Sequence, residues 1–312
     1  MKPMEAENVS KLPVGEQWVY EPKYDGFRCL AFRDGEAIDL QSKNERPLNR
    51  FFPELAAVLL SLPSTRFVID GEIVIPGETF ETLQLRLHPA QSRVATLSEK
   101  YPAQMIAFDL LTDHSGPLAG EPFADRRAAL ESFLATNRHP QLVLSDLTHS
   151  AETAQRWIGQ KGLDGIVAKR LDIPYRPGER AMRKFKVWRS VDAVLAGMYL
   201  DPATGTIDSL LFGLYDDDGR LNFVGHSRVT EAAAELRQAL KEIEGGQGFT
   251  GRSPAVMNRW SRNKRRFVPV RPVLVAELSA DHISGEYMRH GSRIVRWRTD
   301  KAPEDCTMEQ VR

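Results

Sequence analysis

The stretch Glu21-Pro-Lys-Tyr-Asp-Gly-Phe-Arg28 is the part of the sequence that decides how the rest is interpreted. Apolar residues flank it at 18–20 and at 30–32. A lysine in such surroundings is costly to bury as a cation, and once it has lost its proton it is an amine nucleophile. Asp25-Gly26 predicts a tight turn, and Arg28 offers a fork of donors for phosphate or ribose oxygens. The alternative is an ordinary hairpin in which Lys23 extends to solvent.

The composition limits the class of protein. The chain has 312 residues, enough for two domains, and 42% of them are apolar. Lys+Arg and Asp+Glu both number 42, so a basic nucleic-acid-binding surface must be local. The two cysteines lie far apart and form no CxxC pair, which argues against a structural zinc site and against dependence on disulfides. The sequence has no run typical of a signal peptide or a membrane span, so we expect a cytoplasmic protein.

The order of apolar and turn residues predicts an α+β chain with two domains. Up to about residue 189 strands alternate with helices, including expected helices at 50–62, 122–136 and 151–160. From Val191 onward short strands dominate, with one helix expected at 231–244. A small strand barrel interrupted by one helix is typical of an OB fold. We therefore predict a domain at 1–189 with antiparallel sheets and flanking helices, followed by an OB-fold β-barrel at 190–312.

Apolar strands of the first domain carry charges where a core would not favour them. The runs Val68–Ile75 and Asp164–Lys169 contain carboxylates, the second run ends in a lysine, and Lys184-Phe-Lys186 places two lysines on one strand face. Phe108 stands beside Asp109 in a fourth run. Taken singly, these could be turns at Asp70-Gly71 and Asp164-Gly165, a solvated strand face and a core phenylalanine.

Together these features favour nucleotidyl transfer. Lys23 would attack the α-phosphate of a nucleotide, and Glu72 and Asp164 would hold a divalent cation. Lys169, Lys184 and Lys186 would neutralise phosphate charge and keep Lys23 unprotonated. An aromatic side chain would stack on the base.

The ordered set of motifs resembles the covalent nucleotidyltransferases, and among them the small bacterial ATP-dependent DNA ligases. The set ends in Arg296-Trp-Arg298-Thr-Asp300-Lys301, and the resemblance extends over residues 18–306. It implies an adenylation domain followed by the OB domain, with ATP and Mg²⁺ or Mn²⁺ as cofactors. It also implies sealing of 5′-phosphate/3′-hydroxyl nicks through lysyl-AMP and adenylylated DNA, in DNA repair.

The same resemblance assigns expected roles to residues. Lys23 would be adenylylated, with Lys184 and Lys186 holding the α-phosphate. Contacts to the nucleotide are implied for Glu21, Arg28, Lys43, Glu72, Phe108 and Lys169. Glu72 and Asp164 would serve the metal, although Asp164 stands where the family usually has glutamate. On the second domain, the residues implied to orient pyrophosphate and then swing away are Arg298, Asp300 and Lys301.

A local excess of positive charge marks the expected DNA contact. Residues 258–271, named the basic patch here, contain no acid and include Trp260 and Phe267. Such a patch can neutralise phosphates and add apolar contact, and the alternative is a solvated loop. The predicted DNA-binding residues are Arg259, Arg262, Lys264, Arg265 and Arg266. Nicked duplex DNA is the expected partner of a monomeric chain without membrane attachment, and other DNA-repair proteins are further candidates.

Three other functions remain open at this point. A GTP-dependent capping-type guanylyltransferase shares the lysine motif and an OB domain. An RNA ligase would differ only in its polynucleotide. A DNA-binding repair adaptor with an inactive nucleotide site would have been free to lose Lys23, Glu72, Lys184 and Lys186, all of which are present.

Overall fold

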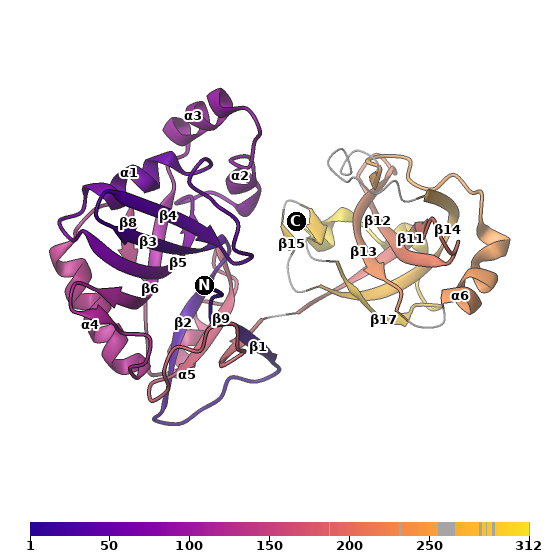
Figure 1. The fold of residues 1–312 in the computed structure, drawn as a ribbon. Coiled ribbons are helices and arrows are strands. Elements are labelled where there is room, and N and C mark those ends of the chain that lie inside the picture. The colour runs from indigo at the N-terminus through magenta and orange to yellow at the C-terminus, as the bar shows by residue number, and fades with distance from the viewer. Residues whose placement is uncertain are drawn as a thin grey trace. The chain divides into compact units, whose positions relative to one another are not determined.

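The computed structural model describes residues 1–186, 188–230, 233–254, 266–280, 283–284, 286–288 and 291–311. It divides the chain into two compact units, Met1–Val187 and Trp188–Arg312, whose elements are labelled in Figure 1.

The larger sheet of the first unit runs in the order β4-β3-β5-β6-β7, with β8 paired in parallel to β6. The other neighbouring pairs are antiparallel. β5 is one continuous strand through Asp70-Gly71-Glu72, so a turn at that position is excluded. The strands are β3 (Phe27–Asp34), β4 (Ala37–Ser42), β5 (Arg66–Val74), β6 (Gln104–Asp113), β7 (Gly116–Pro117) and β8 (Leu142–Leu144).

The smaller sheet of this unit has the order β1-β10-β9-β2. β1 is parallel to β10, and the other pairs are antiparallel. β2 ends at Tyr24 and β3 begins at Phe27, but the two strands belong to different sheets, so the hairpin alternative for Lys23 is wrong. Asp25-Gly26 instead carries the chain from one sheet to the other. The strands are β1 (Ala6–Val9), β2 (Trp18–Tyr24), β9 (Leu163–Arg170) and β10 (Met182–Phe185).

Helices complete the core of the first unit. α1 begins at Pro53, where a missing N–H costs little, and α4 supplies Leu130 and Phe133 to the core beside the larger sheet. The side chain of Ser150 caps α5 by accepting a hydrogen bond from Thr153 N at 3.1 Å. The helix expected at 151–160 is shorter than expected. The helices are α1 (Pro53–Ser61), α2 (Phe80–Gln84), α3 (Gln91–Lys100), α4 (Phe123–Thr136) and α5 (Ala151–Gln155).

The second unit is built on one antiparallel sheet in the order β13-β12-β11-β14-β17. The expected barrel is not closed within the described residues, where a single bridge between Ser227 and Ser292 links the region of β13 to the start of β17. The five strands are β11 (Arg189–Leu200), β12 (Ile207–Tyr215), β13 (Leu221–Arg228), β14 (Arg266–Ala280) and β17 (Arg293–Trp297).

Apolar residues of this sheet form a second hydrophobic core, to which Leu240 of α6 and Met308 and Val311 of η4 contribute. β15 and β16 form a separate two-stranded ladder. The remaining elements are β15 (Ile283–Ser284), β16 (Tyr287–Met288), α6 (Ala233–Leu240), η1 (Lys241–Ile243), η3 (Pro303–Asp305) and η4 (Met308–Val311). Across the described part of the chain, no helix has the length and apolar character needed to cross a membrane.

Candidate active site

Lys23 and Lys186 share one carboxylate, that of Asp164 on β9. Lys23 lies near the end of β2, where the pairing with β9 is irregular between Pro22 and Tyr24. Its Nζ donates to Asp164 Oδ2 at 2.6 Å, and Lys186 Nζ lies 2.9 Å from the same oxygen. The Asp164 side chain is 3% exposed, against 24% for Lys23. A buried carboxylate thus sets the position of the candidate nucleophile, Lys23, and of the Lys186 ammonium group beside it.

Glu72 and Lys184 have pKa values that their surroundings shift. Burial raises the pKa of Glu72 to about 7, although Lys23 and Arg28 act in the opposite direction. Burial also lowers the pKa of Lys184, and the neighbouring cations Lys186, Lys23 and Lys43 lower it further. The field that these cations produce suits a polyanionic ligand. Groups with pKa values shifted in this way often mark functional sites.

Arg28 is held by a carboxylate that the sequence analysis did not assign to it. Its Nε and Nη2 each donate to one oxygen of Asp70 at 2.6 Å, and Nη2 also donates to the Met4 carbonyl at 3.0 Å. The buried Tyr175 hydroxyl donates to Asp70 at 2.6 Å. Burial lowers the pKa of the guanidinium, but pairing with Asp70 outweighs this effect and raises it. Arg28 is therefore a fixed cation, and a nucleotide contact would use the donors that Asp70 leaves.

Phe108 lies among cations. The guanidinium of Arg28 is 4.7 Å from the centre of its ring, and Lys169 Nζ is 4.6 Å from it. Lys169 also pairs with Glu21 at 2.7 Å, and both residues are buried. Glu21 further contacts Arg127 at 3.3 Å. Glu21 and Lys169 thus hold each other, and the Lys169 ammonium group lies beside the Phe108 ring.

Several positions around the site were not predicted. Met4 and Glu5 precede β1, which pairs with the strand carrying Lys184, and Glu5 lies 3.3 Å from Lys43 Nζ. Behind Phe108, Arg126 makes a two-pronged pair with Asp109 at 2.8 Å, and both are buried. Asp70 and Asp109 were visible in the sequence as acids within apolar strands. Nothing in the pattern around Met4, Glu5 or Tyr175 indicated their place.

The predicted residues of the tail lie in the second unit. Arg298 follows β17, and its Nε and Nη2 donate to Asp300 at 2.9 and 2.8 Å. Lys301 Nζ donates to Asp192 Oδ2 at 3.0 Å. Of the predicted DNA-binding residues, Arg266 begins β14 and is exposed. The others, Arg259, Arg262, Lys264 and Arg265, lie outside the described residues.

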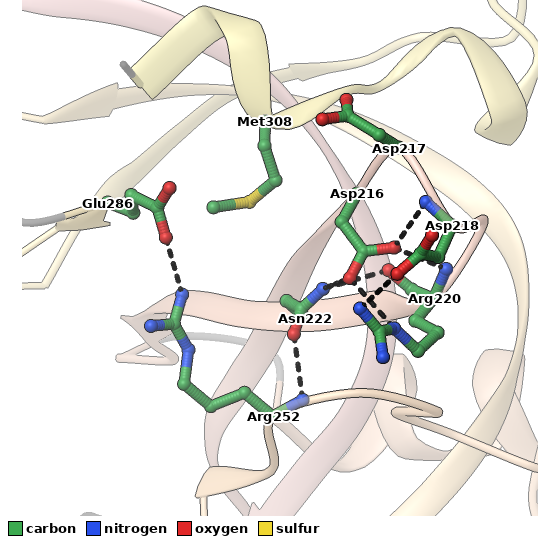
Figure 2. Close-up of a pocket in the computed structure, with 8 residues that line it drawn as sticks. All are labelled: Asp216, Asp217, Asp218, Arg220, Asn222, Arg252, Glu286 and Met308. Atoms are coloured by element: carbon green, nitrogen blue, oxygen red, sulfur yellow. Dashed lines mark hydrogen bonds and ion pairs between the residues drawn. The ribbon is translucent and has the colours of Figure 1, made fainter.

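The second unit also contains a polar pocket of about 390 Å³, which is separate from the predicted site residues. Figure 2 shows Asp216, Asp218 and Arg220 bonded to one another at its edge, with Glu286 and Arg252 paired across from them. Both arginines of the lining are thus paired with carboxylates of the same pocket.

Two carboxylates of the first unit suit a metal ion that arrives with a nucleotide. Among the residues that the structure describes, no group of three or more His, Cys, Asp or Glu side chains could hold an ion by itself. Mg²⁺ is commonly held by one or two carboxylates together with substrate phosphates. Glu72 and Asp164 fit that donor set, although Asp164 already serves two lysines.

Comparisons with known proteins agree with this chemistry. The family described as "ATP dependent DNA ligase domain" matches residues 3–186, and "ATP dependent DNA ligase C terminal region" matches residues 203–301. The chain is 42% identical to DNA ligase C2 of Mycolicibacterium smegmatis over 100% of this chain and 94% of that one. It is 38% identical to DNA ligase C of Mycobacterium tuberculosis, over 100% of this chain and 93% of that one.

A solved structure supports the fold. A structure from a study of DNA binding by minimal Lig E DNA ligases has a TM-score of 0.63 at 16% identity, and it covers 96% of this chain and 99% of that one. At that identity the likeness concerns the fold alone. The family matches and the relatives over the full chain carry the assignment, and from them we conclude that this chain belongs to the ATP-dependent DNA ligases.

Proposed function

We propose that this ligase seals 5′-phosphate/3′-hydroxyl nicks in duplex DNA through AMP bound covalently to Lys23. The observation that carries the proposal is the carboxylate of Asp164 shared between Lys23 and Lys186 at 2.6 and 2.9 Å. Lys23 influences the pKa values of Glu72 and Lys184, and Phe108 belongs to the same unit. An amine, a partner for its proton and a set of cations are what lysine adenylylation requires.

In the first step Lys23 Nζ attacks the α-phosphorus of ATP. A P–N bond forms, the bond from that phosphorus to the bridging oxygen breaks, and pyrophosphate leaves with the electron pair. The amine proton passes to Asp164, whose oxygen already accepts a hydrogen bond from Nζ. Lys184 and Lys186 stabilise the charge that develops on the α-phosphate, and Phe108 stacks on the base.

In the second step an oxygen of the DNA 5′-phosphate attacks the phosphorus of lysyl-AMP, the P–N bond breaks, and the proton held by Asp164 returns to the lysine nitrogen. In the third step the 3′-hydroxyl loses its proton to solvent and its oxygen attacks the DNA 5′-phosphorus. The bond from that phosphorus to the bridging oxygen breaks, and AMP leaves with the electron pair. The same cations serve both steps because each moves negative charge across a phosphate. When bound with ATP, Mg²⁺ or Mn²⁺ held by Glu72 and Asp164 would neutralise phosphate charge.

We further propose that the predicted domains, at 1–189 and 190–312, divide the work. The first carries Lys23 and the nucleotide contacts of Glu21, Arg28, Lys43 and Lys169. The second contributes Arg298, Asp300 and Lys301, which orient pyrophosphate during lysine adenylylation, and then the basic patch, which contacts DNA. We expect the enzyme to act as a monomer in the cytoplasm, together with DNA-repair proteins. Its DNA contacts need not recognise particular bases, because ligation joins the sugar–phosphate backbone.

The test compares nucleotides and polynucleotides. The chain is incubated with α-labelled ATP, GTP or NAD and separated under denaturing conditions, and then it is offered nicked duplex DNA or nicked RNA. We expect labelling from ATP alone and sealing of the DNA nick. Labelling from GTP would favour a capping-type enzyme, and sealing of RNA in preference to DNA would favour an RNA ligase. Either result would overturn the proposal.

A further inference from the structure

Asp192 of β11 lies outside the predicted site residues, and its carboxylate pairs with both of the proposed pyrophosphate-orienting cations. Arg298 Nη1 donates to its two oxygens at 3.0 and 2.9 Å, and Lys301 Nζ donates to Oδ2 at 3.0 Å. All three side chains are largely buried, with 15% of Asp192, 19% of Arg298 and 23% of Lys301 exposed. The Asp192 carboxylate therefore links the segment after β17, which carries Arg298 and Lys301, to strand β11 of the sheet.

The backbone of Asp192 is fixed as well. Its N–H donates to Gln310 Oε1 and its carbonyl accepts from Gln310 Nε2, both at 3.0 Å. Gln310 belongs to η4, and Asp192 pairs with Glu277 in the ladder between β11 and β14. Because the main chain is held on both sides, the carboxylate has little freedom to follow a moving partner. It can impose an orientation on the flexible side chains that it contacts.

The charge balance adds a second effect. Arg298 and Lys301 contribute two positive charges, and Asp192 and Asp300 contribute two negative charges. Arg298 directs Nε and Nη2 to Asp300, which is 61% exposed, while Nη1 points to Asp192. The exposed Asp300 can yield its place to an incoming anion, whereas the largely buried Asp192 stays. Asp192 thus fixes the orientation of Arg298 and Lys301, and displacement of Asp300 frees two donors of Arg298 for the anion. These four side chains are called the cluster below.

We propose that Asp192 is a positioning residue for lysine adenylylation, which presets Arg298 and Lys301 for the pyrophosphate portion of ATP. This inference rests on the proposed function. Long cationic side chains lose rotamer freedom when they bind, and a fixed partner removes part of that cost before ATP arrives. Asp192 does not touch the nucleotide, so its removal acts on the rate of the step that needs the oriented cations.

The test replaces the charge but keeps the shape with Asp192→Asn. We expect lysine adenylylation to slow by about ten- to a hundredfold, as for misplaced binding groups. The KM for ATP should not rise, because the cluster gains net positive charge. The reverse reaction, release of ATP from lysyl-AMP by added pyrophosphate, should slow by the same factor. Asp192→Glu, which keeps the charge, should recover part of both rates.

Asp218→Asn is the matched control, because it removes one negative charge from an Arg220 pair that does not touch the cluster. It should leave both rates unchanged. Sealing of a nick that already carries 5′-AMP tests whether Asp192→Asn is folded, and we expect it within about twofold of the wild type. Unchanged forward and pyrophosphate-driven rates would overturn the inference, as would an equal loss of sealing. Failure of the wild type to label with ATP would instead refute the proposed function.

Discussion

Replacement of Glu72 by glutamine should stabilise the protein while impairing its chemistry. Burial raises the pKa of this carboxyl from 4.5 to about 7, which corresponds to about 3 kcal/mol for holding the ionised form in the fold. Between pH 4.5 and 7, Glu72 is therefore mostly protonated in the folded chain and mostly ionised in the unfolded chain. The stability of the wild type therefore falls as pH rises through that window, and the full cost is present above pH 7.

Glutamine keeps the size and cannot ionise, so Glu72→Gln lacks this cost. At pH 8 the variant should be more stable than the wild type by up to about 3 kcal/mol, and at pH 5 by less than about 1 kcal/mol. Native-state hydrogen exchange of the β5 amides measures this for the first unit alone, which matters because a chain of two units need not unfold in one step. The rate of lysine adenylylation should nevertheless fall in Glu72→Gln, because the proposed metal ligand loses its charge.

Glu99→Gln on α3 is the control, because Glu99 is exposed and the change should not alter stability by more than about 0.5 kcal/mol at either pH. The reasoning fails if Glu72→Gln is no more stable than the wild type at pH 8. It fails equally if the difference between the two proteins does not depend on pH.

Other substitutions probe the phosphate contacts and the DNA surface. Lys184→Ala and Lys186→Ala should each slow adenylylation by about a hundredfold or more in single-turnover labelling, and normal rates in both would exclude their role at the α-phosphate. Lys301→Ala should slow labelling by ATP but seal a nick that already carries 5′-AMP, and the opposite pattern would reverse its assignment. The triple change Arg262→Ala, Lys264→Ala and Arg265→Ala neutralises three cations of the basic patch. It should flatten the slope of log affinity for nicked DNA against log salt concentration by about two to three. An unaltered slope would show that the patch is a solvated loop.

Much of the fold could be predicted from the sequence, because local patterns specify its elements. Pro53 and Ser150 mark the starts of two helices, and the change to short strands after Val191 indicates the β-rich second unit. Strand partners are set by contacts far apart in the chain. For that reason the sequence did not show that β2 and β3 enter different sheets, nor that the barrel of the second unit remains open within the described residues.

The sequence likewise identified residues of the candidate site but not the contacts between them. The ordered motifs named Lys23 and Asp164, but the 2.6 Å contact between them depends on the pairing of β2 with β9 across 141 positions. The sequence also could not show which donors are already occupied. Arg28 is held by Asp70 and Lys169 by Glu21, and each pair forms only when strands or sheets meet. Met4, Glu5 and Tyr175 carried no recognisable signal, since a main-chain carbonyl, a lone carboxylate outside an apolar strand or a single hydroxyl has no sequence pattern.

The most direct measurement is the location of AMP on the chain. The protein is incubated with ATP and Mg²⁺, digested under mildly alkaline conditions that preserve a P–N bond, and its peptides are sequenced by mass spectrometry. We predict one AMP group, attached to Nζ of Lys23, and no adduct in Lys23→Ala. AMP on another residue, or a Lys23→Ala protein that labels as strongly as the wild type, would contradict the assignment of Lys23 as the nucleophile.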